Sequence, residues 1–135
     1  MALAGAFHGA PLVIANSVTE AVQQAPGAVL VTGSHGGASV VGYALAARPR
    51  LVVFNDAGVG YENAGIAALG PLQDAGIAAC TVAHDTARIG DAASTWATGV
   101  ISHANAAAAA LGALRGTSLC DWLSAPSGES SPARR

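Results

Sequence analysis

VLVTGSHGGASVVGYALAA, residues 29–47, predicts a strand that runs through a glycine-rich turn into a helix. Residues 28–33 form a short apolar run, rich in β-branched residues and ending in glycine, which is typical of a buried strand. Residues 36–47 are compatible with a helix, and Arg48-Pro49 is expected to end it because proline cannot continue a helix. The stretch therefore reads as one strand–helix unit.

The same pattern recurs along the chain. A second apolar run, residues 51–54 (LVVF), ends in a glycine-punctuated turn, and a helical pattern that Pro71 must bend or shorten resumes at Glu62. A third strand is expected at residues 77–83, and residues 11–15 are a candidate fourth. Strands without alternation that are separated by helices are typical of a parallel sheet covered on both faces. We predict a small three-layer, Rossmann-like α/β unit with a mainly parallel sheet of about four strands.

The region after residue 83 divides into a polar segment, a long helix and a tail. Residues 84–91 (HDTARIGD) are the most polar interior segment, and Asp91 is placed to cap a helix over residues 92–111. His103 falls on the apolar face of that helix, where it is expected to be a satisfied core residue. We predict a single α/β domain over residues 1–124 and a disordered, Pro/Ser-rich tail over residues 125–135.

Composition restricts the classes of function. Hydrophobic residues make up 52% of the chain and charged residues 10%, so we expect surfaces buried between copies in a homo-oligomer. A net charge of −2 gives no basic field for nucleic acid. The chain contains no lysine, which excludes a Walker-type phosphate loop and a Schiff base.

Cysteine content and hydropathy predict the compartment. Cys80 and Cys120 form neither a disulfide framework nor a CxxC pair, so free thiols in a reducing cytoplasm are expected. The first residues lack the basic start and long apolar run of a signal peptide. No run of about 18 uninterrupted apolar residues occurs, so we expect no membrane span.

Polar residues follow the strands predicted at residues 28–33, 51–54 and 77–83, whereas ordinary connectors precede them. Ligands of open parallel α/β sheets bind at the carboxyl ends of the strands, near a topological switch point. The sequence therefore predicts a pocket at this edge, formed by the pairs Ser34-His35, Asn55-Asp56 and His84-Asp85.

The GSHGG turn, residues 33–37, has two interpretations. Free amides at Gly36 and Gly37 would favour an anionic or carbonyl oxygen, with Ser34 as an oxyanion donor. Alternatively, the turn is only a tight connection in which Ser34 caps the helix. A nucleophilic Ser34 also remains open, because Ser34, Asp56 and His84 follow the chain order of an α/β-hydrolase triad.

The other two turns supply candidates for proton transfer and substrate binding. His84 or His35 would transfer a proton, and Asp56 would orient the histidine. Alternatively, the side chains of Asn55 and Asp56 only accept backbone amides in a turn. Arg88 would anchor an acidic substrate group, unless it pairs internally with a neighbouring aspartate. His35, Asp56, His84 and Asp85 also form a possible set for a divalent metal, although no close-spaced metal signature is present and no cofactor is required.

We therefore predict a small-molecule enzyme, a hydrolase or lyase that uses acid–base chemistry at a carbonyl, amide or imine carbon of a small acidic metabolite. The predicted catalytic residues are His84, His35, Asp56 and Ser34. The predicted substrate-binding residues are Gly36, Gly37, Asn55, Arg88 and Asp85. The alternative is a non-catalytic metabolite- or anion-binding module, or a small subunit of a larger complex.

Overall fold

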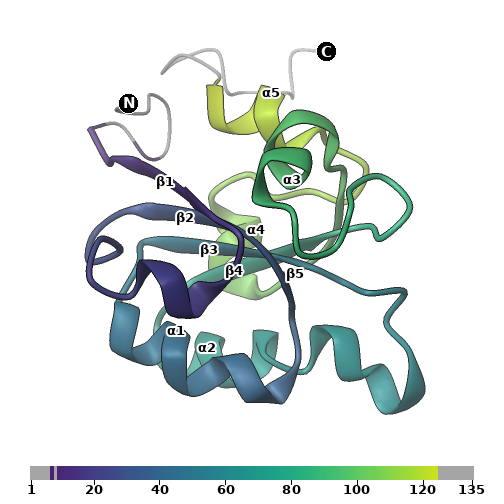
Figure 1. The fold of residues 1–135 in the computed structure, drawn as a ribbon, viewed down its shortest axis with the longest axis horizontal. Helices are drawn as coiled ribbons and strands as arrows, with labels where there is room; N and C mark the ends of the chain where they lie inside the picture. The colour runs from purple at the N-terminus through teal and green to yellow at the C-terminus, as the bar shows by residue number, and fades with distance from the viewer. Residues whose placement is uncertain (1–6, 8, 125–135) are drawn as a thin grey trace.

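The computed structural model, which describes residue 7 and residues 9–124, is a five-stranded sheet between helices (Figure 1). The strands lie in the order of the chain: the first four are parallel, and the fifth is antiparallel to the fourth. The strands are β1 (Leu12–Ala15), β2 (Val29–His35), β3 (Leu51–Asn55), β4 (Ala78–Val82) and β5 (Ile101–Ala104). The α/β fold and mainly parallel sheet are confirmed, with one strand more than predicted.

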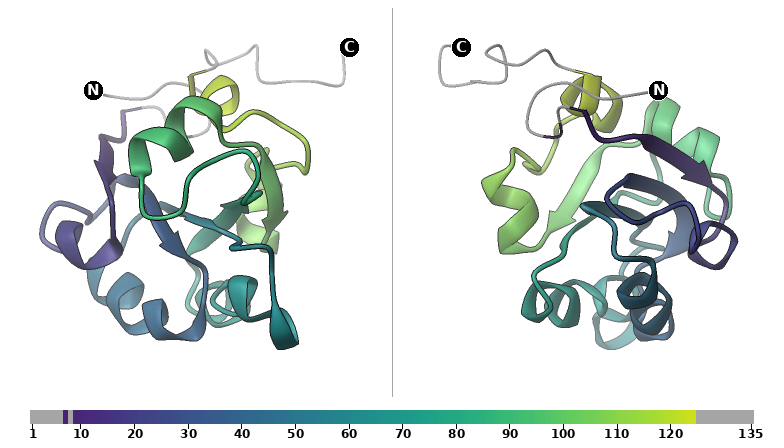
Figure 2. Two further views of the ribbon diagram at one scale, coloured as in Figure 1. Left: turned by 45° about the vertical axis from the view of Figure 1, so that its right-hand side comes forward. Right: turned by 90° about the vertical axis from the view of Figure 1, so that its left-hand side faces the viewer.

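Helices cover both faces of the sheet, which gives the three predicted layers (Figures 1 and 2). One face packs its side chains against η2, α1 and α2, and the other against α3 and α5. Both sides of β3 and β4 are therefore buried, which explains why these strands read as continuous apolar runs. The helices are η2 (Val18–Ala21), η3 (Ala38–Val40), α1 (Val41–Ala47), η4 (Tyr61–Ile66), α2 (Leu69–Asp74), α3 (Ala92–Thr98), α4 (Ala106–Ala110) and α5 (Leu119–Ser124).

The sheet has no reversal of strand order, so the expected switch point of that kind is absent from the described strands. The chain instead changes faces after β4. The connections that follow β1, β2 and β3 pack on one face, whereas α3 packs against β2 and β1 on the opposite face. The loop after β3 and the loop after β4 run toward opposite faces of the sheet. These two loops therefore separate from each other at the carboxyl ends of β3 and β4. A crevice is expected there for the same geometric reason as at a switch point.

The single helix predicted over residues 92–111 is wrong. Residues 92–111 instead form a helix, a strand and a second short helix. The helix α3 ends at Thr98, β5 pairs with β4, and α4 begins after Asn105. The alanine-rich segment has a helical period, but pairing with the edge of β4 outweighs this local preference. The predicted helix from Glu62 is likewise divided into η4 and α2, and Pro71 lies in the first turn of α2, where its missing N–H is harmless.

Asn105 joins the end of β5 to β4, α4, α2 and the segment before β4. Its side-chain oxygen accepts hydrogen bonds from the amides of Ala79 in β4 (3.1 Å) and Ala108 in α4 (3.0 Å). Its side-chain nitrogen donates to the carbonyls of Leu69 (3.3 Å) and Ile77 (3.0 Å). This one buried amide caps α4 and fixes β5 against β4.

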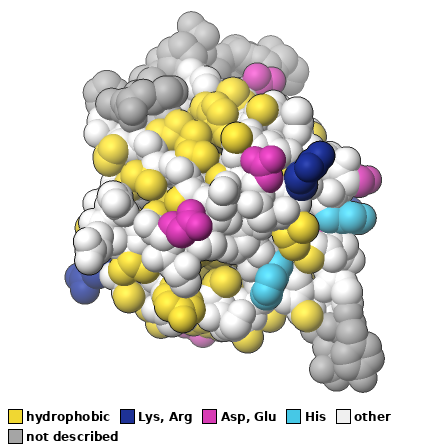
Figure 3. All heavy atoms as spheres, in the orientation of Figure 1, with side chains coloured by type: hydrophobic (Ala, Val, Ile, Leu, Met, Phe, Trp, Pro, Cys, Tyr) yellow, Lys and Arg dark blue, Asp and Glu magenta, His cyan; other side chains and the backbone are white. Residues whose placement is uncertain are grey.

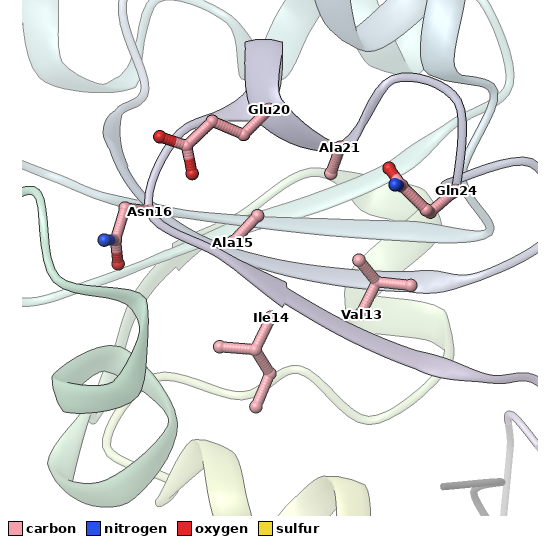
Figure 4. A pocket seen from close by; sticks show the side chains of 7 residues that line it. All are labelled: Val13, Ile14, Ala15, Asn16, Glu20, Ala21 and Gln24. Carbon is pink, nitrogen blue, oxygen red and sulfur yellow. The ribbon is translucent and has the colours of Figure 1, made fainter.

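The two edges of the sheet differ. The outer edge of β5 is covered by residues 116–118, through hydrogen bonds between Ile101 and the backbones of Gly116 and Thr117. The outer edge of β1 instead borders a groove of about 390 Å³, and Ile14 there is 43% exposed (Figure 4). Within the described residues, no strand pairs with this side of β1.

No helix in the described part of the chain is long and apolar enough to cross a membrane. The predicted tail, residues 125–135, lies outside the described residues, and the domain boundary at residue 124 remains a prediction.

Candidate functional site

Asp56 lies at the centre of the candidate site, directly after β3. Its backbone amide donates to the carbonyl of Val82 (2.9 Å), which holds it beside the end of β4. Its carboxylate oxygen Oδ1 accepts hydrogen bonds from the amides of Gly58 (2.8 Å) and His84 (3.0 Å). Asp56 is 4% exposed, so its carboxylate is buried between the two loops that separate at β3 and β4.

The environment of Asp56 favours its charged form. Burial alone would raise the pKa of this carboxyl group, but hydrogen bonds from the Ser102 hydroxyl and from the amides of Gly58 and His84 outweigh burial. The charge of a protonated His84 acts in the same direction, and the net result is a pKa below the ordinary value. Asp56 is therefore a buried carboxylate that is ionised at neutral pH.

His84 places an accessible imidazole next to this carboxylate. Its Nδ1 atom lies 3.6 Å from Oδ1 of Asp56, and its side chain is 59% exposed. A nearby carboxylate favours the tautomer in which Nδ1 carries the proton, which leaves Nε2 as the basic nitrogen. The same Asp56 oxygen holds the backbone of His84 and faces its ring, so the structure brings together these two predicted residues.

β5 adds Ser102 and His103, which were not among the predicted site residues. Nδ1 of His103 lies 4.0 Å from Oδ2 of Asp56, the carboxylate oxygen other than the one that faces His84. This nitrogen is buried and has no hydrogen-bond partner among the described residues, so the interpretation of His103 as a satisfied core residue is wrong. The hydroxyl of Ser102 also bonds that of Thr81 in β4 (2.9 Å). Because residues 92–111 were predicted to form one helix, neither residue was assigned to a strand beside the site. The only sequence signal for the strand is the β-branched pair Val100-Ile101 before them.

The residues of the GSHGG turn have local partners. The amide of Gly36 donates to the carbonyl of Asn55 (3.1 Å), and the amide of Gly37 donates to Nδ1 of His35 (3.1 Å). The hydroxyl of Ser34 accepts from the amide of Val18 (3.2 Å), near the end of β1. Within the described part of the chain, no hydrogen bond or ion pair joins Ser34 or His35 to Asp56. The structure therefore does not bring these two residues to the Asp56–His84 pair, and both glycine amides are already occupied.

The remaining predicted residues fall into two groups. Asn55 is fully buried: its side chain donates to the carbonyl of Ala87 (3.0 Å) and accepts from the amide of Ala57 (2.7 Å), so it ties the two loops together. Asp85 and Arg88 are exposed, and no described residue forms an ion pair with either side chain. Asp91 caps α3 through the amide of Ser94 (3.1 Å), which confirms that prediction.

The exposed polar groups of this loop lie near one another on the surface. His84, Asp85 and Arg88 are all exposed within five residues of the chain. Figure 3 shows histidine, basic and acidic side chains close together on the right of the view. A charged small molecule would meet both signs of charge there.

Metal binding and thiol chemistry are the two other kinds of chemistry that the residue types suggest. In the described part of the chain, no three His, Cys, Asp or Glu side chains are grouped so that they could hold a metal ion. Cys80 is fully buried, as predicted, and burial raises the pKa of its thiol to about 12. It is therefore protonated and inert at neutral pH.

Comparison of the chain with protein-family models, with curated proteins and with solved structures finds no match in any of the three.

Proposed function

We propose that the chain is a small-molecule enzyme, a hydrolase or lyase, that transfers protons through the Asp56–His84 pair. Its target would be a carbonyl, amide or imine carbon of a small acidic metabolite. One observation carries this proposal: a buried, ionised carboxylate lies 3.6 Å from an exposed imidazole and also binds the backbone of the same histidine. A histidine oriented by a carboxylate is the usual general base of enzymes that work near neutral pH.

The roles of the surrounding residues follow from their exposure. Nε2 of His84 would accept the proton from water or substrate, and Asp56 would stabilise the imidazolium that forms. Arg88, which is exposed in the same loop, would bind a carboxylate of the substrate. The amides of Gly36 and Gly37 already donate to acceptors within the chain, so they are not free to stabilise an oxyanion. Ser34 is likewise left out as a nucleophile, because its hydroxyl accepts from the amide of Val18 and no hydrogen bond of the described residues joins it to His84 or Asp56.

Hydrolysis of p-nitrophenyl acetate tests the proposal without knowledge of the natural substrate. His84→Gln is expected to lower the enzyme-dependent rate by roughly 100-fold, the scale of general-base catalysis, and Asp56→Asn to lower it as well. His35→Gln is the matched control, because it removes another exposed imidazole at the same edge of the sheet. Equal rates for His84→Gln and the unmodified chain, or a rate no higher than that of the same concentration of free imidazole, would contradict the proposal.

A binding module remains the second candidate, favoured by a separate cavity beside His35. This cavity is lined by glycine, alanine and valine together with His35, and by no carboxylate or cysteine of the described side chains. A binding module has no catalytic turnover, so substitution of His84 would leave the rate of hydrolysis at the uncatalysed level in both proteins.

We further propose that the chain is cytoplasmic and self-associates. Cys80 and Cys120 are unpaired, which supports a reducing compartment. The four residues of β1 include no charged residue, proline or bulge, the features by which edge strands normally avoid pairing, although Pro11 directly precedes them and Glu20 lines the neighbouring groove. Pairing of β1 with β1 of a second copy would continue the sheet.

A further inference from the structure

A cavity of about 340 Å³ lies between the turn that follows β2 and the loop that follows β3, and the side chain of His84 is not among its lining residues. Its volume is at the lower end of the range for small-molecule sites. The lining residues are His35, Gly37, Ala38, Ala57, Val59, Gly60, Ala64, Gly65 and Ala67. His35 is the only one of these with a polar side chain, so it decides which polar group a ligand can present.

The hydrogen bond from Gly37 fixes the tautomer of His35. The amide of Gly37 donates to Nδ1 of the ring at 3.1 Å, so this nitrogen carries no proton. In the neutral ring the proton is then on Nε2, which becomes a hydrogen-bond donor. No described residue accepts a hydrogen bond from Nε2. His35, which lines the cavity, therefore has one hydrogen-bond donor available for a ligand.

The backbone around the cavity offers little to an anion. The amides of Ala57 and Gly58 donate to the side chains of Asn55 and Asp56, and the amide of Val59 donates to the carbonyl of Asp56. The amides of Gly36 and Gly37 are also occupied. The amide of Ala38, the first residue of η3, donates to no described acceptor and lines the cavity, whereas an anion-binding nest needs several free amides that point toward one place.

The loop wall is held in an unusual backbone conformation. Ala57 and Val59 have φ angles of 52° and 66°, and Gly58 and Gly60 between them and after them are also positive. A β-branched residue such as Val59 rarely adopts this conformation, and such residues cluster at binding and active sites. The loop thereby presents the side chains of Ala57 and Val59 to the cavity as a fixed apolar wall.

We propose that this cavity binds a small uncharged molecule with a compact apolar body and a carbonyl oxygen that accepts a hydrogen bond from Nε2 of His35. The class includes primary amides and ketones of about the size of a benzene derivative. The proposal is independent of the chemistry assigned to Asp56 and His84, because neither side chain lines the cavity.

Benzamide is the probe, and binding is followed by the amide chemical shifts of residues 35–38, 57–60 and 64–67 in ¹H–¹⁵N spectra. Benzylamine and benzoate have the same size but carry opposite charges. We expect saturable shifts confined to these segments for benzamide, and weaker binding of both charged analogues. A chain with no saturable shift at these amides, or one that binds benzylamine more tightly than benzamide, would overturn the proposal.

Two substitutions test the role of His35. His35→Leu removes the donor and is expected to weaken benzamide binding about five-fold, the value of one neutral hydrogen bond. Gly37→Ala keeps the histidine but displaces its ring, because a Cβ atom at residue 37 would lie 2.6 Å from Nδ1 and Cε1 of His35. Gly37 has a φ of −83°, so alanine fits the backbone, and Gly42→Ala, which meets no atom within 4 Å, is the control.

A third substitution fills the cavity. Ala64 is exposed at its wall, and Ala64→Leu is expected to abolish benzamide binding, whereas Ala109→Leu on the exposed side of α4 leaves it unchanged. Binding that survives both His35→Leu and Ala64→Leu would show that benzamide binds elsewhere and would refute the assignment. Benzamide binding and p-nitrophenyl acetate hydrolysis are measured on the same unmodified chain, so saturable binding without turnover would leave this proposal standing while the proposed catalysis failed.

Discussion

Replacement of Asn105 by alanine tests how β5, with Ser102 and His103, is held in the site. The side chain of Asn105 makes four hydrogen bonds to the backbone of α2, β4, α4 and the segment before β4. Alanine removes all four and adds no new contact. The unfolded chain gains nothing from the change except a slightly higher helix preference.

The expected loss of stability is about 3 kcal/mol. Loss of the cap on α4 costs about 1 kcal/mol, the usual value for an Asn-to-Ala change at this position. The amide of Ala79 loses the Asn105 side-chain acceptor inside a fully buried strand, which costs about 2 kcal/mol. The free-energy cost of the lost hydrogen bonds to the carbonyls of Leu69 and Ile77 is taken as zero. A carbonyl tolerates the loss of one donor better than an amide tolerates the loss of its acceptor.

Urea denaturation followed by circular dichroism measures this difference. Asp91→Ala is the matched control, because Asp91 caps α3 through a single amide and should cost only about 1 kcal/mol. The slope of the free energy of unfolding against urea should be the same for both variants, since each exposes the same surface on unfolding. Equal losses for Asn105→Ala and Asp91→Ala would refute the role given to the extra hydrogen bonds.

Three further predictions concern Asp56, the thiols and the open edge. Because the folded state lowers the pKa of Asp56, this residue stabilises the fold above its unfolded pKa of about 3.9, and the stability is lost as pH falls through the folded value. The stability advantage of the unmodified chain over Asp56→Asn should therefore narrow in thermal melts only as the pH falls below about 4; a difference that does not narrow there would contradict this prediction. Ellman's reagent should react with Cys120 in the native protein and with Cys80 only after denaturation, since the Cys80 thiol is buried; two native equivalents would disprove this. In light scattering, Ile14→Lys should lower the mass of the assembly, whereas Leu45→Lys, at a residue of similar exposure on α1, should not.

The sequence predicted the fold from β2, β3 and β4 because both faces of these strands are covered. Their apolar runs are uninterrupted; β2 and β3 end in glycine-rich turns, and β4 ends in the polar segment that begins at His84. The antiparallel β5 could not be predicted in the same way. Its four residues lie among alanines with a helical period, and only pairing with β4 makes them a strand.

The candidate site was predicted in part for the same reason. Asp56 and His84 follow strands that the sequence identifies, and the parallel sheet brings the ends of those strands together. The position of His103 depends on β5, so sequence reasoning assigned it to the core. For Ser34 and Asn55, residue type alone does not distinguish a catalytic side chain from one that satisfies a nearby backbone group.

The tautomers of His84 and His35 test the central claim most directly. Long-range ¹H–¹⁵N spectra at about pH 8.5, above the ordinary imidazole pKa of about 6.5, show which ring nitrogen carries the proton. We predict the proton on Nδ1 in His84, which faces Asp56, and on Nε2 in His35, whose Nδ1 accepts from Gly37. Asp56→Asn should change the spectrum of His84 and leave that of His35 as it was. A proton on Nε2 in both rings, unaffected by Asp56→Asn, would contradict the claim that Asp56 orients His84 for proton transfer.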